Sequence, residues 1–198
     1  ALSEIVGLQL PENSQYKEDN HKYLFQAISQ ANEIYKLNLN KNNDASNYLK
    51  NRGINKFSID RYELGFSPNS WDSLRKSALK KDYENYNQSG LMIKNEKGHY
   101  YDRFRNRIMF PIKNISGKII GFGGRIISNE QPKYLNSPET NIFRKANELY
   151  GLYEAKNKKG NIDKIIVVEG YIEPYLPAYV FLSKSQAFFD EINETELN

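Results

Sequence analysis

The sequence predicts an α+β fold in which a mostly helical first part is followed by a strand-rich, basic second part. Apolar residues recur at helical spacing between Tyr23 and Leu39, as on the buried face of an amphipathic helix. After Gly90, short apolar runs alternate with turns that contain glycine, which is typical of β-hairpins. The unbroken run of residues 165–168 is typical of a buried parallel strand, so an α/β sheet is expected to begin there.

The composition is that of a folded protein. Of 198 residues, 39% are hydrophobic and 13% are aromatic, which is too rich in rings for a disordered chain. The absence of cysteine excludes disulfides and thiolate zinc sites, and it favours a reducing compartment such as the cytoplasm. His21 and His99 are too few for a histidine metal cluster, and no run reaches the ~20 apolar residues of a membrane helix. We therefore expect neither bound zinc nor a membrane partner.

The first part of the chain is expected to be a linker followed by four helices. Residues 1–20 are polar and predict the linker, at whose end Asp19 or Asn20 can cap a helix. The apolar positions of this first helix are spaced for one face, and the simplest interpretation is that they face the core. They are Leu24, Ala27, Ile28, Ala31, Ile34 and Tyr35.

Three shorter helices are predicted from capping residues and helix breakers. Asp44 can cap the second helix, which Gly53 would end, and Ser58 can cap the third. Ser70 precedes the fourth helix, which would run to about Leu79. This part of the chain is therefore expected to be mostly helical.

The second part of the chain is predicted to form two hairpins and then a short helix. The hairpins pair residues 91–93 with 100–101 and residues 108–112 with 118–122. Ser137 is a capping residue, Pro138 fits the first helical position, and Glu139 adds an acid to the first turn. A short helix is therefore expected to start at Ser137 and to end before Gly151.

Charge is unevenly distributed along the chain, although the net charge is only +4. Between Lys94 and Lys145 there are eleven lysines and arginines against four acids, whereas residues 169–198 carry six acids and one lysine. A local charge of +7 attracts anions, and nucleic acid is the class of partner that it suggests. The alternative is a solvated surface, so the motifs within the segment must decide.

The segment from Tyr101 to Arg107 is the strongest candidate for phosphate binding. If it is extended, Arg103, Arg105 and Arg107 lie on one face at about 7 Å spacing, close to that of phosphates along a nucleic acid strand. Planar guanidinium groups suit phosphates better than ammonium groups do. The alternative is a solvated edge strand whose charges prevent aggregation.

Three further positions offer ligand-binding groups. Residues 121–125 combine flexible backbone with an arginine; they fail as a dinucleotide-binding motif, and a hairpin bend is the alternative. Residues 131–137 combine a cation, a ring, an amide and a helix start, which are groups that hold a phosphate and stack a base, although each alone is more often ordinary surface. Glu169 ends the predicted parallel strand, where one carboxylate can hold Mg²⁺ or act as a base.

Five motifs of the chain occur together in a known family. They are YDRFRNRIMFPI, GKIIGFGGR, PKYLNSPETNIF, LYGLYEA and IIVVEGY. In order and spacing they closely resemble the RNA polymerase core of bacterial DnaG-type DNA primases, over about residues 20–171. The resemblance implies a basic amino-terminal subdomain in residues 21–160 and the start of a Toprim subdomain in residues 161–171. It also implies the synthesis of short RNA primers on single-stranded DNA, with Mg²⁺ or Mn²⁺ held by Toprim acids.

The resemblance further implies roles for individual residues. Four arginines match the family's basic positions along the template groove, namely Arg52, Arg103, Arg105 and Arg125. Four residues match its basic ridge beside the active centre, namely Lys133, Tyr134, Asn136 and Lys145. Glu169 matches the Toprim glutamate, which implies a catalytic and metal-binding role. The implied partners are a single-stranded DNA template, nucleoside triphosphates and a replicative helicase, which the family binds through a further domain.

The sequence departs from the family after Tyr171. The family has an aspartate four residues beyond the glutamate, whereas this chain has Glu173 followed by Pro174. Residues 172–198 show no family pattern and are therefore predicted to be a diverged or non-family tail. Two functions remain open. One is an incomplete DNA primase polymerase core, and the alternative is a single-stranded-DNA-binding fragment without polymerase activity.

Overall fold

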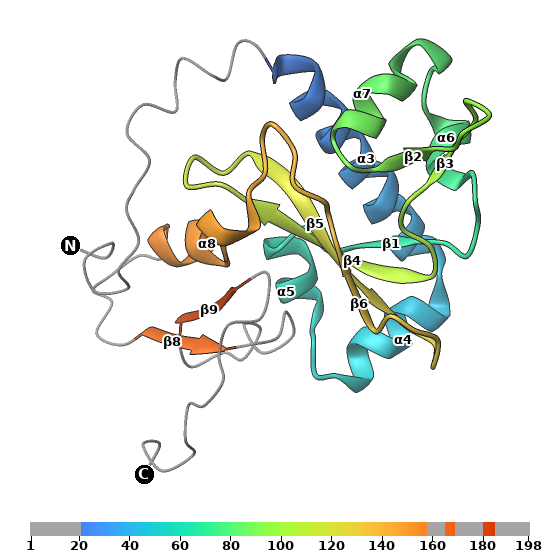
Figure 1. The fold of residues 1–198 in the computed structure, drawn as a ribbon. Coiled ribbons are helices and arrows are strands. Elements are labelled where there is room, and N and C mark those ends of the chain that lie inside the picture. The colour runs from blue at the N-terminus through green and yellow to red at the C-terminus, as the bar shows by residue number, and fades with distance from the viewer. Residues whose placement is uncertain (1–20, 158–164, 169–179, 185–198) are drawn as a thin grey trace.

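A four-stranded antiparallel sheet, with helices packed on both of its faces, forms the centre of the protein (Figure 1). The computed structural model describes residues 21–157, 165–168 and 180–184. Among the described residues, none of the helices combines the length and hydropathy needed to span a bilayer. The mixture of helices and strands confirms the predicted α+β class.

Helices dominate the first part of the described chain, as predicted. The longest is α3 (Lys22–Lys41), and its predicted core positions are buried apart from Ile34, which is half-buried. The short strand β1 (Gly65–Ser67) was not predicted. The remaining helices of this part are α4 (Asn43–Asn51), α5 (Lys56–Arg61), α6 (Ser73–Ser77), the 3₁₀ helix η2 (Lys80–Asp82) and α7 (Tyr83–Gln88).

The capping residues predicted for the second and third helices were wrong, and those predicted for the first, Asp19 and Asn20, lie outside the described residues. The side chain of Asn42 accepts the N–H of Ala45 at 2.8 Å at the start of α4, and the side chain of Asn55 accepts the N–H of Ser58 at 2.9 Å at the start of α5. Asp44 and Ser58 therefore lie within the first turns. Each helix starts earlier than predicted because an upstream asparagine supplies the capping oxygen.

Both predicted hairpins are confirmed. The first pairs β2 (Met92–Lys94) with β3 (Tyr100–Asp102), and the second pairs β4 (Arg107–Lys113) with β5 (Ile119–Ile126). Two short strands flank the second hairpin, so that the central sheet has the order β1-β4-β5-β6, with β6 at Tyr134–Asn136.

The core lies on both faces of the central sheet because side chains alternate along β4. Ile108 and Phe110 pack in one buried cluster with residues of α4 and α5. Met109, between them, packs in a second buried cluster with residues of α3, α6 and α7. The sheet therefore lies between two groups of helices and packs against both.

The helix predicted from Ser137 is wrong. The hydroxyl of Ser137 accepts the N–H of Phe122 at 2.9 Å, which ties this segment to β5 instead of capping a helix. The hydroxyl of Thr140 then accepts the N–H of Phe143, whose ring is fully buried. Only the 3₁₀ helix η3 (Lys145–Asn147) forms before Gly151, because these side chains satisfy backbone donors in an irregular path.

A second, smaller sheet follows the central one. It has the order β7-β9-β8, where β7 is Leu149–Tyr150, β8 is Ile165–Val168 and β9 is Val180–Lys184, and α8 (Leu152–Lys156) lies between β7 and β8 in the chain. Pairing of β8 with β9 is parallel, which confirms the parallel strand predicted at residues 165–168. Strand β9 was not predicted. The assignments of residues 161–171 to Toprim and of 172–198 to a non-family tail stay predictions, and the linker 1–20 lies outside the described residues.

Candidate nucleic-acid interface

The segment between β3 and β4 is a loop, so the extended conformation on which the shared arginine face depended is absent there. The ring of Phe104 is fully buried, and the hydroxyl of Ser67 donates a 2.6 Å hydrogen bond to the Phe104 carbonyl, so the chain turns inward between Arg103 and Arg105. Asn106 has a φ of 54°, in the left-handed region that short polar residues tolerate. The three arginines of this segment therefore do not share a strand face, and the edge-strand alternative is wrong as well.

Arg105 lies over the ring of Trp71, the only tryptophan in the chain. Its guanidinium carbon is 3.9 Å from the ring centroid, and its Nη1 donates to the carbonyls of Asp102 and Arg103. The Trp71 ring remains 62% exposed. A ring and a guanidinium in this arrangement can stack on a base and meet a phosphate at the same place. Trp71 was not predicted as a site residue, since its one signal in the sequence is its position between polar residues, outside any apolar stripe.

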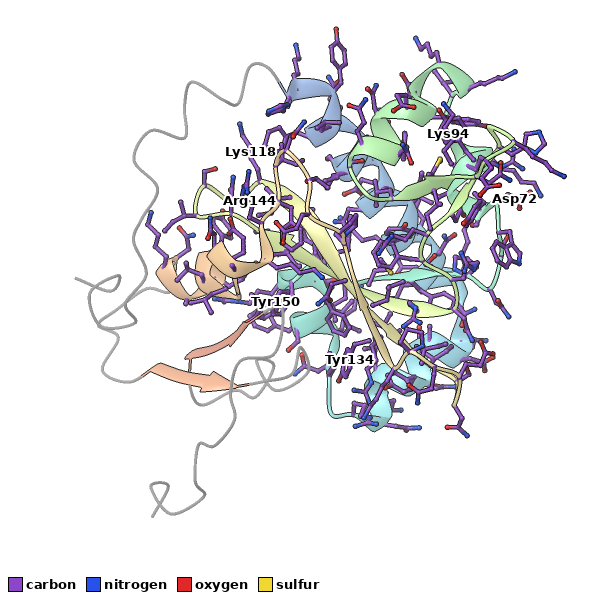
Figure 2. The ribbon with its side chains drawn as sticks, in the orientation of Figure 1. Asp72, Lys94, Lys118, Tyr134, Arg144 and Tyr150 are labelled. Atoms are coloured by element: carbon purple, nitrogen blue, oxygen red, sulfur yellow. The ribbon has the colours of Figure 1, made fainter. Side chains whose placement is uncertain are left out.

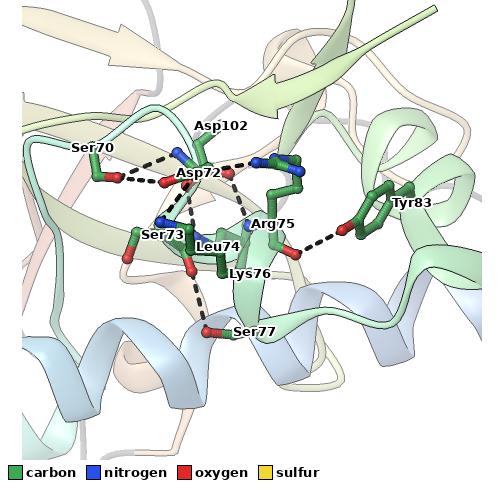
Figure 3. A network of polar contacts seen from close by, with 9 residues as sticks. All are labelled: Ser70, Asp72, Ser73, Leu74, Arg75, Lys76, Ser77, Tyr83 and Asp102. Carbon is green, nitrogen blue, oxygen red and sulfur yellow. Dashed lines mark hydrogen bonds and ion pairs between the residues drawn. The ribbon is translucent and has the colours of Figure 1, made fainter.

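A polar network fixes the backbone that carries Trp71 (Figure 3). The carboxylate of Asp102 accepts the N–H groups of Leu74 and Arg75 at 2.6 and 3.0 Å, at the start of α6. The N–H of Asp102 donates to the carbonyl of Trp71 at 2.8 Å. Burial raises the pKa of Asp102 above its ordinary value. Both oxygens of this carboxylate are thus bonded to helix backbone rather than to the neighbouring arginines.

Arg125 holds two tyrosine rings that come from different elements. Its guanidinium donates to the hydroxyls of Tyr48, in α4, and of Tyr134, in β6. The guanidinium carbon is also 4.9 Å from the centroid of the Tyr134 ring, because Arg125 and Tyr134 are paired in register across β5 and β6. The exposed Arg52 has its guanidinium carbon 5.6 Å from the Tyr48 ring, and Lys133 Nζ is 5.9 Å from the Tyr134 ring. Arg125 itself is buried.

Arg103 connects these two groups. Its Nη2 donates to the carbonyl of Asn136 at 3.5 Å, at the end of β6 away from Tyr134. Its Nε is buried and has no hydrogen-bond partner, and burial is the main cause that lowers the pKa of Arg103. We call the connected surface the basic face. It comprises Tyr48, Arg52, Trp71, Arg103, Arg105, Arg125, Lys133, Tyr134 and Asn136.

The cations of the basic face are not neutralised by carboxylates. In the described part of the chain, ion pairs involve other cations, such as Lys113 with Glu63 and Glu154. Arg52, Arg103, Arg105, Arg125 and Lys133 take part in none of these ion pairs. Figure 2 labels one member of this surface, Tyr134 in β6. An anionic ligand would therefore meet uncompensated positive charge along it.

Two of the predicted site residues, Lys145 and Glu169, stay predictions. Lys145 lies in η3, where its backbone N–H donates to the carboxylate of Glu139 at 2.9 Å. Glu169 lies outside the described residues. Within the described ranges, no three His, Cys, Asp or Glu residues form a group that could hold a metal ion.

The chain matches known proteins along most of its length. The family model of the DNA primase catalytic core, N-terminal domain, matches residues 34–156. A DNA primase of Salmonella typhimurium is 42% identical over 185 residues, which cover 87% of this chain and 31% of the relative. A DNA primase of Legionella pneumophila is 45% identical over 152 residues, which cover 76% of this chain and 26% of the relative. The chain thus spans about a third or less of the length of these relatives.

Solved structures show the same fold. A DnaG primase catalytic domain bound to single-stranded DNA has 37% sequence identity and a TM-score of 0.77, over 84% of this chain and 56% of that one. The RNA polymerase domain of Mycobacterium tuberculosis primase DnaG, in complex with a double-stranded DNA oligomer with a 6-nucleotide overhang, has 28% identity and a TM-score of 0.74, over 85% of this chain and 56% of that one. Together with the matched family model, these likenesses establish that the chain belongs to the DnaG primase catalytic core family and contains its N-terminal domain.

Proposed function

We propose that this chain is part of a DNA primase and that its basic face binds the single-stranded DNA template for RNA primer synthesis. The observation that carries the proposal is the pairing of an exposed Trp71 ring with the guanidinium of Arg105. These two groups offer a stacking surface and a cation at one place.

The residues of the basic face have different proposed roles, which follow from how exposed each side chain is. Arg52 and Lys133 are exposed and can reach phosphates, while Arg103 and Arg105 are half-buried and offer donors of fixed position. Arg125 is buried, so it acts by holding the rings of Tyr48 and Tyr134. Because none of these groups reads base edges in a fixed pattern, binding is expected to depend on salt and only weakly on sequence.

Metal chemistry is proposed for the family's Toprim acids. Mg²⁺ or Mn²⁺ held by those acids would supply stabilisation of the negative charge that develops during nucleotidyl transfer. The described residues do not supply a ligand set for such an ion, so we assign none of them a role toward it. Glu169 stays the proposed catalytic and metal-binding residue. Nucleoside triphosphates, the replicative helicase and a cytoplasmic location are likewise proposed from family membership.

Binding of a fluorescently labelled single-stranded oligonucleotide, measured by anisotropy at several salt concentrations, tests the interface. We expect Arg103→Glu with Arg105→Glu to weaken binding at least tenfold and to flatten the salt dependence, which is roughly −0.7 per neutralised phosphate on a single strand. The matched control is Lys80→Glu with Lys81→Glu, which makes the same charge change at exposed residues outside the basic face.

Equal losses of DNA affinity in the two double variants would contradict the proposal. The affinity would then depend on net charge alone and not on where the charges lie. Arg105→Glu alone, compared with Lys81→Glu alone, serves if the first double variant does not fold, as judged by circular dichroism. The alternative function, binding without primer synthesis, shares this interface and differs only in a primer synthesis assay.

A further inference from the structure

We propose that Arg107 is a positioning residue, which holds Lys133 and Tyr134 in place for template binding instead of contacting phosphate itself. The inference rests on the proposed function. Arg107 is 5% exposed, although it is the third arginine of the segment that the sequence predicted to bind phosphate. Its guanidinium meets main-chain carbonyls of β5 and of the segment that leads into β6.

The guanidinium of Arg107 joins β5 to the segment that leads into β6. Nη1 donates to the carbonyl of Gly124 at 3.2 Å and to that of Lys133 at 3.3 Å. Nη2 donates to the carbonyl of Pro132 at 2.8 Å. A single planar group thus fixes three carbonyls on two neighbouring segments, which the single ammonium of a lysine cannot span.

The structure makes room for this guanidinium. Gly124 has no side chain, and a Cβ at this position would lie 3.0 Å from Arg107 Cδ and 3.0 Å from the Phe104 ring. Burial is the main cause that lowers the pKa of Arg107, and the positive charge of Arg105 adds to it. A buried cation is costly, so its placement indicates a role that the carbonyl bonds fulfil.

The hydrogen bonds from Arg107 help to fix the position of the Lys133 backbone. The Lys133 carbonyl accepts a second hydrogen bond from the N–H of Ile126 at 3.1 Å, and the Lys133 N–H donates to the side chain of Gln131 at 3.1 Å. The backbone of Lys133 is therefore fixed on both sides while its side chain is exposed. The next residue, Tyr134, contacts Arg125. Without the three hydrogen bonds from the Arg107 guanidinium, this segment would be free to move. DNA binding would then have to order it, which would lower the affinity.

The test compares Arg107→Lys, Lys133→Ala and the combined variant by single-stranded DNA affinity, salt dependence and melting temperature. We expect Arg107→Lys to weaken binding roughly fivefold to tenfold although it keeps the positive charge. In the Lys133→Ala background, Arg107→Lys should cost less than half of its effect in the unmodified chain. A full, additive loss with a further decrease in salt dependence would show a direct phosphate contact and overturn the inference.

Two controls separate the possible failures. Ile112→Val loosens the core elsewhere and should lower the melting temperature without changing the affinity of the folded protein. If Arg107→Lys leaves the affinity unchanged, this inference fails whatever Lys133→Ala does. The proposed function fails separately, if Arg103→Glu with Arg105→Glu loses no more affinity than its matched control. Arg107→Gln replaces Arg107→Lys if the latter does not fold, and faster amide exchange at Ile126 is expected in either variant.

Discussion

Single cations in this protein are used in two different ways. Lys113 is buried between Glu63 and Glu154, at 2.7 and 3.1 Å, and serves the fold by joining β4 to α8. Arg105, in contrast, has an aromatic ring and backbone carbonyls as neighbours. A cation that is held by rings keeps its charge available to a ligand, whereas one held by carboxylates does not.

Trp71→Ala should weaken single-stranded DNA binding by about 1 to 3 kcal/mol, because the variant loses a stacking surface. The melting temperature should change little, since the ring is 62% exposed. Trp71 is the only tryptophan of the chain, so quenching of intrinsic fluorescence by unlabelled oligonucleotide reports on this position directly. Leu79→Ala, at a residue with 63% exposure, is the matched control. A dissociation constant for Trp71→Ala equal to that of the unmodified chain would show that the ring does not stack on DNA.

Glu148 should make the folded protein less stable as pH rises. Burial raises its pKa to about 7, so between its ordinary range and pH 7 the unfolded chain is ionised while the folded chain is still protonated. The contribution of Glu148 to the free energy of unfolding is fully present below about pH 4.5 and is lost by pH 8. Glu148→Gln should therefore raise the free energy of unfolding at pH 8 by roughly 1 kcal/mol, after allowance for solvent at this half-buried group, and change little at pH 4.5.

Denaturant unfolding of both proteins at pH 4.5 and pH 8 measures this difference. The control is Glu96→Gln, the same substitution at an exposed glutamate in the turn between β2 and β3, measured at both pH values. A stabilisation by Glu148→Gln that is the same at pH 4.5 and pH 8 would contradict the assigned titration.

At the scale of elements, the sequence predicted the regular pieces and missed the pieces fixed by distant contacts. In α3 the spacing of the apolar residues indicates which face is buried. In the two hairpins the turns are indicated by residues next to one another in the sequence. The three-residue strands β1 and β6 have no such pattern, because they are strands only by pairing with β4 and β5. The helix predicted from Ser137 failed for the same reason, since its hydroxyl bonds to Phe122, fifteen residues earlier in the chain.

Gly117→Ala should destabilise the protein more than Gly98→Ala, although both glycines have a positive φ, of 87° and 79°. A Cβ at Gly117, in the turn between β4 and β5, would lie 2.5 Å from the ring of Tyr153 in α8, whereas a Cβ at Gly98 meets nothing within 4 Å. We expect about 1 kcal/mol for Gly98→Ala and about twice that for Gly117→Ala, measured by denaturant unfolding. In a Tyr153→Ala background the two substitutions should lower the free energy of unfolding by equal amounts. A difference that persists there would show that the Tyr153 ring is not the cause.

At the scale of the whole molecule, the sequence selected every member of the basic face except Tyr48 and Trp71, but it did not predict their arrangement. Arg52, Arg125 and Tyr134 were chosen from motifs, and the structure brings them together through Tyr48, which is 77 residues from Arg125 in the chain. A pairing over that distance has no local signal. Arg107 was placed on the wrong side of its segment, since periodicity assumes a strand where the burial of Phe104 imposes a loop.

The last prediction concerns what the 198-residue chain does when purified alone: it should bind single-stranded DNA and synthesise no primers. Nucleotidyl transfer needs metal ions held by several converging carboxylates. The resemblance implies an aspartate four residues after Glu169, where the sequence has Glu173 followed by Pro174. The assay incubates the chain with nucleoside triphosphates, Mg²⁺ and single-stranded DNA, beside an intact primase as the positive control. Primers that appear with this chain and vanish with Glu169→Gln would show that its own residues complete the metal site.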